Sequence, residues 1–360
     1  MNTSAVADMD QGAHEQSSPQ TQRPNVITRF LTWWLPRLAE RPARGRRVLR
    51  FSPVFTYSFM HPETAYGIEP VYGRWLWVSP AYYVKEVWKA PISLGEKLFT
   101  VAVGLTTGVF WTLLLHQAAN NRDVRWRARQ VARALETEIL DLAKGSSDAG
   151  RPLIIDVLGA GSGCYMIDAI LRARQAGVPN ISCRFIDKDP GTYQLARQYA
   201  HKRGLDDREF ERLCPSLEQD VLSAAAGDHT NSRHIVLLIG LGDHIDKDPR
   251  ARERNESLEA DDIRDTNRNL ISLYRQIHDS LVPNGRFITS FISHNGEERF
   301  LTKVAKWRHR HRSWEMVQGI LKLSGWEGSA PRLFTGPFGI QHVVVVQRDP
   351  QREASAEGRG

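Results

Sequence analysis

Three glycines spaced two residues apart are the first residues in this chain that suggest chemistry. Gly159, Gly161 and Gly163 follow the apolar segment 153–158, and a segment typical of a helix comes next. Glycine lets a strand turn sharply into a helix and lets the backbone approach a ligand, and the first N–H groups of that helix can bind a polar group. The spacing is GxGxG, because Cys164 stands where a dinucleotide-binding GxGxxG pattern requires glycine. The segment therefore predicts a ligand site that is not of the dinucleotide-binding type.

An acidic residue follows the glycines at the distance, about 20 residues, where a ribose-binding acid is expected. Segment 181–187 reads as a second strand and ends in Asp187. Its carboxylate can accept hydrogen bonds from both hydroxyls of a ribose. Asp189 and Pro190 are typical of a helix cap and a first helical residue, so we assign Asp189 a structural role.

Candidates for acid–base chemistry follow two later apolar segments. Asp243 and His244 come after segment 234–239, and His294 comes after segment 286–292. Histidine can act as a general base near neutral pH, and a carboxylate beside it can orient the imidazole or bind a substrate hydroxyl or amine. The alternative is structural: Asp243 caps the next turn and His244 is an ordinary loop histidine. Both alternatives remain open on the sequence.

A dense basic run at 306–312 precedes Ser313, which is typical of a helix N-cap. Within this run, Arg308 and Arg310 could bind a phosphate or carboxylate of a substrate. A solvated charged face would also explain the run.

The elements that must position these residues alternate between strand and helix. From 152 to 348 the pattern ends in consecutive strands, with a turn at 283–285 and a hairpin at 334–341, and a helical stretch is expected at 262–281. This predicts an α/β fold with a doubly wound, mostly parallel sheet and a late antiparallel edge. Ligands bind such sheets outside the carboxyl ends of the strands, where the candidate residues fall.

The region 120–348 resembles a bacterial family of class I S-adenosylmethionine-dependent methyltransferases. The resemblance rests on Gly-Ser-Gly-Cys-Tyr at 161–165, Gly-Leu-Gly-Asp-His at 240–244 and Trp-Arg-His-Arg at 307–310. It implies a Rossmann-like sheet of seven strands and S-adenosylmethionine as cofactor. The implied reaction transfers a methyl group to an oxygen or nitrogen of a small or lipid-like substrate.

The resemblance also implies roles for individual residues. The implied cofactor-binding residues are Gly159, Ala160, Gly161, Ser162, Gly163, Asp187, Lys188, Asp220, Val221 and Gly240. Asp220, after the third strand, would meet the adenine amino group. Methyl transfer is an in-line displacement that needs a nucleophile held about 3 Å from the methyl group. Asp243, His244 and His294 are the candidates for managing its proton.

One residue departs from the family pattern. Val157 holds the usual place of the acid in the first motif, and Asp156 lies one position earlier. A shift of one residue on a strand points a side chain to the opposite face. We therefore expect Asp156 to be structural and the methionine end of the cofactor to be held mainly by backbone groups.

Two other functions remain open on the sequence. The same fold supports other reactions of adenosylmethionine or its decarboxylated form, but an aminopropyl transferase needs an acid-rich polyamine site, which the net charge of +7 disfavours. The second alternative is a non-catalytic scaffold at a membrane surface that keeps a vestigial fold. The intact glycines and Asp187 argue against it.

Composition and charge limit which compartment, partners and domain organisation the sequence allows. The three cysteines make no metal-type spacing, so we expect no metal site and a reduced, cytoplasmic compartment. The net charge favours anionic partners, but no nucleic-acid motif accompanies it. We divide the chain into a disordered tail at 1–25, a helical and aromatic region at 26–119, the methyltransferase-like domain at 120–348 and a second tail at 349–360.

The region before the domain permits a membrane association. Segment 26–38 joins aromatic and aliphatic residues to clustered arginines, which suits a membrane interface or a helix packed on the domain. Segment 98–115 is uncharged and barely long enough to span a bilayer. Its threonines and glycines, with basic residues on both sides, favour a buried or interfacial helix instead. Segment 57–83 is expected to wall the substrate site.

Overall fold

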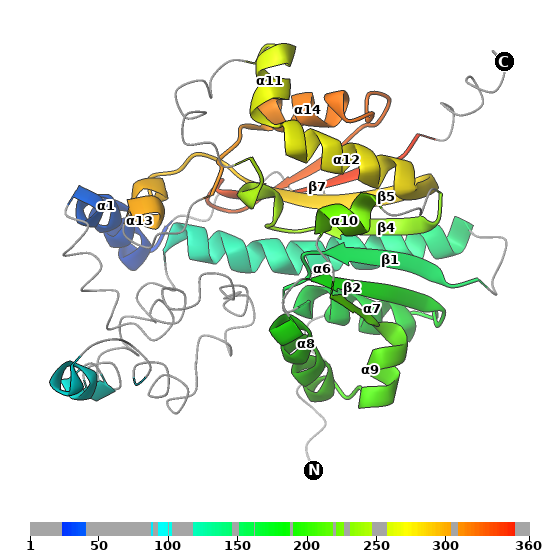
Figure 1. Ribbon diagram of the computed structural model, residues 1–360, viewed down its shortest axis with the longest axis horizontal. Helices are drawn as coiled ribbons and strands as arrows, with labels where there is room; N and C mark the ends of the chain where they lie inside the picture. The colour runs from blue at the N-terminus through cyan, green and yellow to red at the C-terminus, as the bar shows by residue number, and fades with distance from the viewer. Residues whose placement is uncertain are drawn as a thin grey trace.

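The computed structural model describes residues 24–40, 88, 93–99, 101–102, 118–145, 151–161, 163–187, 190–218, 221–226, 231–246, 258–303 and 309–349. Within these ranges a sheet is covered by helices on both faces (Figure 1). The strands are β1 Leu153–Leu158, β2 Ile181–Asp187, β3 Ser216–Glu218, β4 Arg233–Leu238, β5 Leu281–Ile292, β6 Arg332–Thr335 and β7 Gln341–Gln347. The helices are α1 Val26–Glu40, α6 Ala119–Gly145, α7 Cys164–Gln175, α8 Pro190–Lys202, α9 Asp207–Leu213, α10 Val221–Ala226, the short 3-10 helix η3 Gly242–His244, α11 Ala260–Thr266, α12 Arg268–Ser280, α13 Glu298–Lys303 and α14 Trp314–Leu323.

The sheet has the order β3-β2-β1-β4-β5-β7-β6. Strands β1 to β5 run parallel, whereas β7 is antiparallel to both of its neighbours, β5 and β6. The chain runs outward from β1 to β3 and then crosses back to β4, so the strand order reverses between β1 and β4. Ligands of open α/β sheets bind at such a reversal. The predicted α/β fold with a parallel sheet and a late antiparallel edge is confirmed.

Alternate residues of the central strands enter two separate cores. Ile155 and Val157 face the layer of helices that contains α6 and α7, whereas Val236 and Leu238 face the layer that contains α12 and α14. Side chains alternate between the faces of a strand, and a sheet covered on both sides is apolar on both. The apolar runs of the sequence therefore mark strands that are buried on two faces.

Two sequence-based boundaries were wrong. Strand β5 starts at Leu281, not after the turn at 283–285, and Asn284 inside it has a φ of 63°. Its register with β4 shifts between Arg233 and Ile235, so the expected turn is an irregularity within the strand. The single helix expected at 262–281 is divided into α11 and α12. The break falls at the buried Asn267, whose backbone leaves the helical conformation (φ −131°, ψ 28°) and whose Oδ1 accepts from Nε of the distant Arg312 at 3.1 Å.

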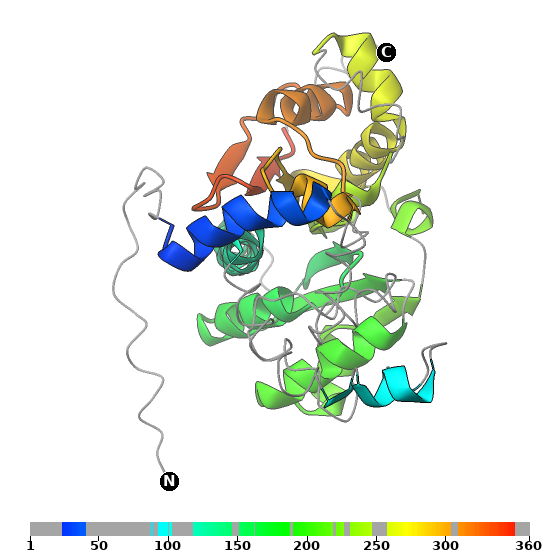
Figure 2. The same cartoon turned by 90° about the vertical axis from the view of Figure 1, so that its left-hand side faces the viewer.

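Helix α1 packs beside α13, next to one end of α6 (Figure 2). Leu31 and Leu35 are buried against Phe300 and Leu301, so one face of the helix lies on the domain. Its other face leaves Trp33 53% exposed. No helix in the described ranges is both long and apolar enough to cross a membrane. Most of segment 98–115, all of 57–83, and most of both tails lie outside the described residues.

Candidate cofactor and substrate site

The loop between β1 and α7 has a backbone that only glycine adopts easily. Gly159, Gly161 and Gly163 have φ values of 63°, 55° and 57°, in the left-handed region. A Cβ at Gly159 would lie 2.7 Å from a methyl carbon of Leu241, and one at Gly163 would lie 2.7 Å from the Phe185 ring. Leu241 and Phe185 therefore pack closely against this loop. Side chains at these positions would both strain the backbone and displace their neighbours.

Asp187 lies beside this loop, as its predicted role requires. It is the last residue of β2, is half-buried, and accepts a hydrogen bond from the backbone N–H of Gly161 through Oδ2 at 3.0 Å. The carbonyl of Ile186 accepts from the N–H of Gly159 at 2.8 Å, which joins the end of β2 to the turn. A carboxylate has about four acceptor positions, so Asp187 can bind the loop and ribose hydroxyls together.

The other predicted cofactor residues differ in what the structure says of them. Ala160 is buried in the loop, and Val221 begins α10 and packs into the core beside Ile186. Ser162, Lys188 and Asp220 lie outside the described residues, as do Asp189 and the predicted substrate residue Arg308.

Asp156 is structural, as the shifted motif predicted. Its fully buried carboxylate forms two hydrogen bonds of 2.6 Å with Arg184, and Arg233 lies 2.6 Å from Oδ2. Burial lowers the pKa of the Arg233 guanidinium, although Asp156 opposes this shift. The pair of arginines therefore holds the acid inside the sheet, away from the glycine loop.

Arg127 is a candidate site residue that the sequence did not indicate. It projects from α6 toward Gly240, which follows β4 with a φ of 76°: a Cβ at Gly240 would lie 3.4 Å from Nη2 of Arg127. Its Nη1 donates to Oε1 of Gln341 at 2.9 Å. The available signal was its position, because a charged residue three after Val124 and four before Val131 falls on the apolar face of the helix.

Asp243 is buried next to the end of β5, and its Oδ1 accepts from the N–H of Ile292 at 3.3 Å. Burial raises the pKa of Asp243 to about 6, although Arg312 and Arg127 act to lower it. Arg312 is itself buried and donates to the carbonyls of Gly242 and Ile245 at 3.1 and 3.3 Å. Asp243 and Arg312 thus hold η3 against β5.

Arg310 has a different position from the one expected of a substrate-binding residue. Its side chain is buried, and Nη1 donates to the carbonyls of Asp246 and Thr266. Its backbone N–H donates to the carbonyl of Asp243 at 2.8 Å. A guanidinium engaged with two backbone carbonyls fastens the loop after η3 to the loop before α14. The basic run therefore contributes to the packing of the domain rather than to a solvated face at this residue.

Four histidines gather at the carboxyl ends of β4 and β5. The ring centroids of His244 and His309 are 4.8 Å apart, those of His309 and His311 6.5 Å, and those of His311 and His294 5.5 Å. His294 also lies 3.2 Å from Glu298. The sequence indicated His244 and His294 separately, but His309 and His311 were read only as part of a basic run. The three segments that bring them together, at 244, 294 and 309–311, are separate in sequence.

No protein-family model matches the chain, and no curated protein matches it either. Solved structures do resemble it. A possible exported protein from Bordetella parapertussis is 14% identical with a TM-score of 0.49, over 93% of this chain and 100% of that chain. Magnesium protoporphyrin IX methyltransferase from Synechocystis PCC 6803 is 15% identical with a TM-score of 0.41, over 64% and 86%. The N-methyltransferase NodS from Bradyrhizobium japonicum WM9 is 11% identical with a TM-score of 0.36, over 61% and 97%.

Proteins named as methyltransferases recur among these structures. The TM-scores are below 0.5, so the assignment of function depends on the chain's own residues. Those residues are the glycine loop, Asp187 beside it, the buried guanidinium of Arg127 next to Gly240 after β4, and the group of histidines.

Proposed function

We propose that this chain is an S-adenosylmethionine-dependent methyltransferase that binds its cofactor at the loop after β1. The observation that carries the proposal is the hydrogen bond from Gly161 N–H to Asp187 Oδ2, at the carboxyl ends of β1 and β2. The bond places the Asp187 carboxylate, which we propose as the ribose acceptor, next to the backbone of Gly161. S-adenosylmethionine supplies an activated methyl group on sulfur, which a nucleophile can accept by in-line displacement.

The residues present fit the nucleoside part of this cofactor. Asp187 would accept hydrogen bonds from the ribose hydroxyls, and the left-handed glycines let the loop backbone approach the ligand. Val221 lies after β3, on the side where the adenine would bind, and we assign Asp220 to the adenine amino group. Ser162 lies between Gly161 and Gly163, and Lys188 directly follows Asp187. These two residues complete the proposed set of cofactor-binding residues.

Asp156, the shifted acid of the first motif, does not bind the methionine part of the cofactor in this proposal, and Arg127 takes this role. The methionine part of the cofactor ends in a carboxylate, and Asp156 is engaged by two arginines inside the sheet. Gly240, over which Arg127 lies, precedes Leu241, and Leu241 contacts Gly159. The guanidinium is therefore close to the glycine loop. We infer that Arg127 pairs with the cofactor carboxylate, because guanidinium binds carboxylates through two parallel hydrogen bonds.

The methyl acceptor would bind at the ends of β4 and β5, beside the histidines. His244 is half-buried in η3, and its imidazole can take a proton from an oxygen or nitrogen nucleophile near neutral pH. Asp243 is buried behind it and holds η3 in place. We propose His244 as the proton acceptor and Asp243 as a positioning residue, for a small or lipid-like substrate.

Calorimetric titration with S-adenosylmethionine and with its product S-adenosylhomocysteine tests the cofactor site. We expect Asp187→Ala to weaken binding by at least about tenfold, which corresponds to about 1.4 kcal/mol. Asp261→Ala is the matched control, because Asp261 is an exposed acid on α11. Asp243→Asn should weaken binding less than Asp187→Ala. Absence of binding to the unmutated protein, or the opposite order of the two variants, would contradict the assignment.

A second experiment identifies the acceptor. The purified protein is incubated with cofactor that carries a labelled methyl group and with cell extract, and the label is followed into lipid, small-molecule and protein fractions. Transfer into any fraction that is lost in Asp187→Ala supports catalysis. A protein that binds the cofactor but transfers no label would be a non-catalytic scaffold.

A further inference from the structure

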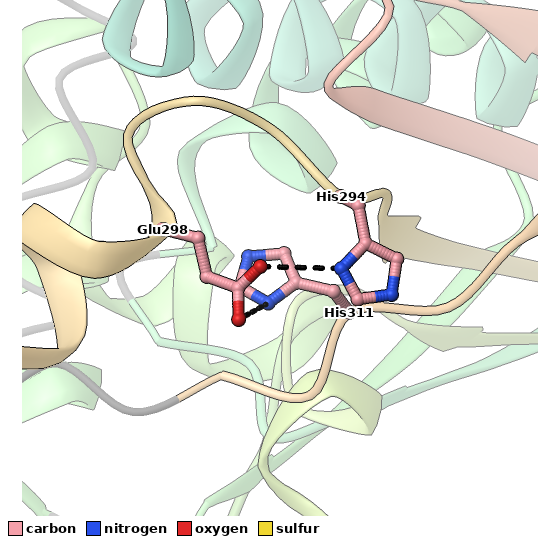
Figure 3. Close-up of side chains that lie close together, drawn as sticks. All are labelled: His294, Glu298 and His311. Carbon is pink, nitrogen blue, oxygen red and sulfur yellow. Dashed lines mark hydrogen bonds and ion pairs between the residues drawn. The ribbon is translucent and has the colours of Figure 1, made fainter. Parts of the chain in front are cut away.

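A histidine, a glutamate and a second histidine lie close together at the carboxyl end of β5 (Figure 3). His294 follows β5, Glu298 begins α13, and His311 lies in the segment before α14. Figure 3 shows the three side chains directed toward one another, with one carboxylate oxygen of Glu298 joined to each imidazole. The Nδ1 atom of His294 is 3.2 Å from Glu298 Oε2, and that of His311 is 3.6 Å from Oε1.

These separations suit the ligands of a metal ion. Zinc binds imidazole nitrogen and carboxylate oxygen at about 2.0–2.2 Å, so the ligand atoms of a tetrahedral ion lie about 3.3 Å apart. The two nitrogen–oxygen distances, which run to different oxygens of the Glu298 carboxylate, are close to this value. One ligand atom from each of the three residues lies within 4.8 Å of the others. The side chain of His294 is 59% exposed. Small rotations of this side chain would bring its ligand nitrogen toward about 3.3 Å from the other two ligand atoms.

The backbone around the group is held in place. The N–H of Arg312, next to His311, donates to the carbonyl of Ile292 at 2.9 Å, which fixes this segment to the end of β5. Asn295 Oδ1 accepts from the N–H of Glu297 at 2.9 Å, and the Asn295 carbonyl accepts from Glu298 N–H at 3.3 Å. His311 is buried, whereas His294 faces solvent. Such a set is preorganised and keeps a path for an ion to enter.

We propose that His294, Glu298 and His311 form a binding site for a divalent transition-metal ion. Two imidazoles and one carboxylate favour zinc, cobalt or iron(II) over magnesium or calcium, which prefer oxygen ligands. Three protein ligands leave a coordination position for water or for a substrate atom. No metal site was expected from the sequence, because residues 294 and 311 belong to separate loops and their spacing matches no metal motif.

Cobalt(II) is the probe, because its visible absorption changes when it enters a site with nitrogen ligands. Tag-free protein is titrated with cobalt and then with zinc, without any cofactor or substrate, so the result does not depend on the proposed function. We expect about one cobalt ion per chain, displacement by zinc, and no displacement by magnesium. Glu298→Gln and His294→Ala should each lower the affinity by at least about tenfold.

The matched control is His201→Ala. His201 is an exposed histidine in the last turn of α8 and is paired with Asp207. It should bind cobalt as the unmutated protein does. His294→Ala and Glu298→Gln change partly exposed side chains, so retained circular dichroism checks their folding. Absence of a cobalt spectrum in the unmutated protein, or equal affinity in all three variants, would overturn the proposal.

Discussion

At the scale of single residues, position along a strand decides what an acid does. Asp156 and Asp187 lie on neighbouring strands, yet one is fully buried between Arg184 and Arg233 and the other ends its strand beside Gly161. The first carboxylate is neutralised within the sheet, and the second lies at the edge where ligands of such sheets bind. The same type of side chain therefore serves stability in one place, and in the other it has the recognition role that we propose.

Asp156→Ala should destabilise the fold strongly. Removing one partner of a buried ion pair leaves uncompensated charge on the other, at a cost of about 3–5 kcal/mol. Here two guanidinium groups lose their acid, and Arg233 is one of the largest fully buried side chains. Chemical denaturation of the variant measures the change in the free energy of unfolding. A loss below about 1 kcal/mol, as is typical of a surface pair, would contradict the role we assign.

The proposed role of Arg127 predicts a selective change in affinity. S-adenosylhomocysteine carries a carboxylate, whereas 5′-methylthioadenosine has the same nucleoside without it. We expect Arg127→Met to weaken binding of the first ligand by about tenfold or more and to leave the second nearly unchanged. Asp187→Ala should weaken both ligands, because both contain the ribose. Equal losses for both ligands in Arg127→Met would mean that the arginine only supports the packing of β4 and β7.

At the scale of elements, the sequence was most informative where local signals agree. The apolar run before the glycines, the second strand at 181–187 and the cap at Ser313 are all found where they were expected. Each is specified by residues within a few positions of one another. The start of β5, the break at Asn267 and the burial of Arg310 depend on contacts between distant segments. No local pattern encodes them.

Helix α14 offers a direct test of a local signal. Ser313 is its N-cap, with an extended backbone and a side-chain oxygen that accepts from the N–H of Met316 at 3.2 Å. Ser313→Ala removes this acceptor and should lower the free energy of unfolding by about 1 kcal/mol. Ser313→Asp is the matched control, because it restores an acceptor at the same position. Equal stability of the alanine and aspartate variants would show that the cap contributes nothing.

At the scale of the whole molecule, helix α6 ties the described parts of the chain together. Near its start, Asp123 accepts from the N–H groups of Phe338 and Ile340 in the turn before β7. Further along, Glu138 is paired with Arg286 of β5 and with Arg332 of β6. One helix thus contacts both ends of the antiparallel edge. The position of Arg127 between these two acids is fixed by the same contacts, so the cofactor site that we propose depends on the docking of α6.

The junction between α6 and α13 makes the stability of the molecule depend on pH. Glu297, just before α13, is buried, and its Oε1 accepts from the N–H of Ala119 at 2.9 Å. Burial raises its pKa from 4.5 to about 7, although this hydrogen bond acts to lower it. The folded state therefore binds the proton more tightly than the unfolded state. Its contribution to stability is complete below the unfolded pKa and is lost as the pH rises through the folded one.

Comparison with Glu297→Gln isolates this contribution, because glutamine keeps the shape and an acceptor oxygen but does not titrate. The unmutated protein should lose stability relative to the variant between about pH 5 and pH 8, by at most about 3 kcal/mol at 1.4 kcal/mol per unit of pKa. Chemical denaturation of both proteins at each pH gives a double difference, in which a buried acid that does not interact with Glu297, such as Asp243, cancels. A double difference of zero would mean that Glu297 stays ionised in the folded protein. The junction would then hold a buried carboxylate whose hydrogen bonds from α6 outweigh the cost of burying its charge.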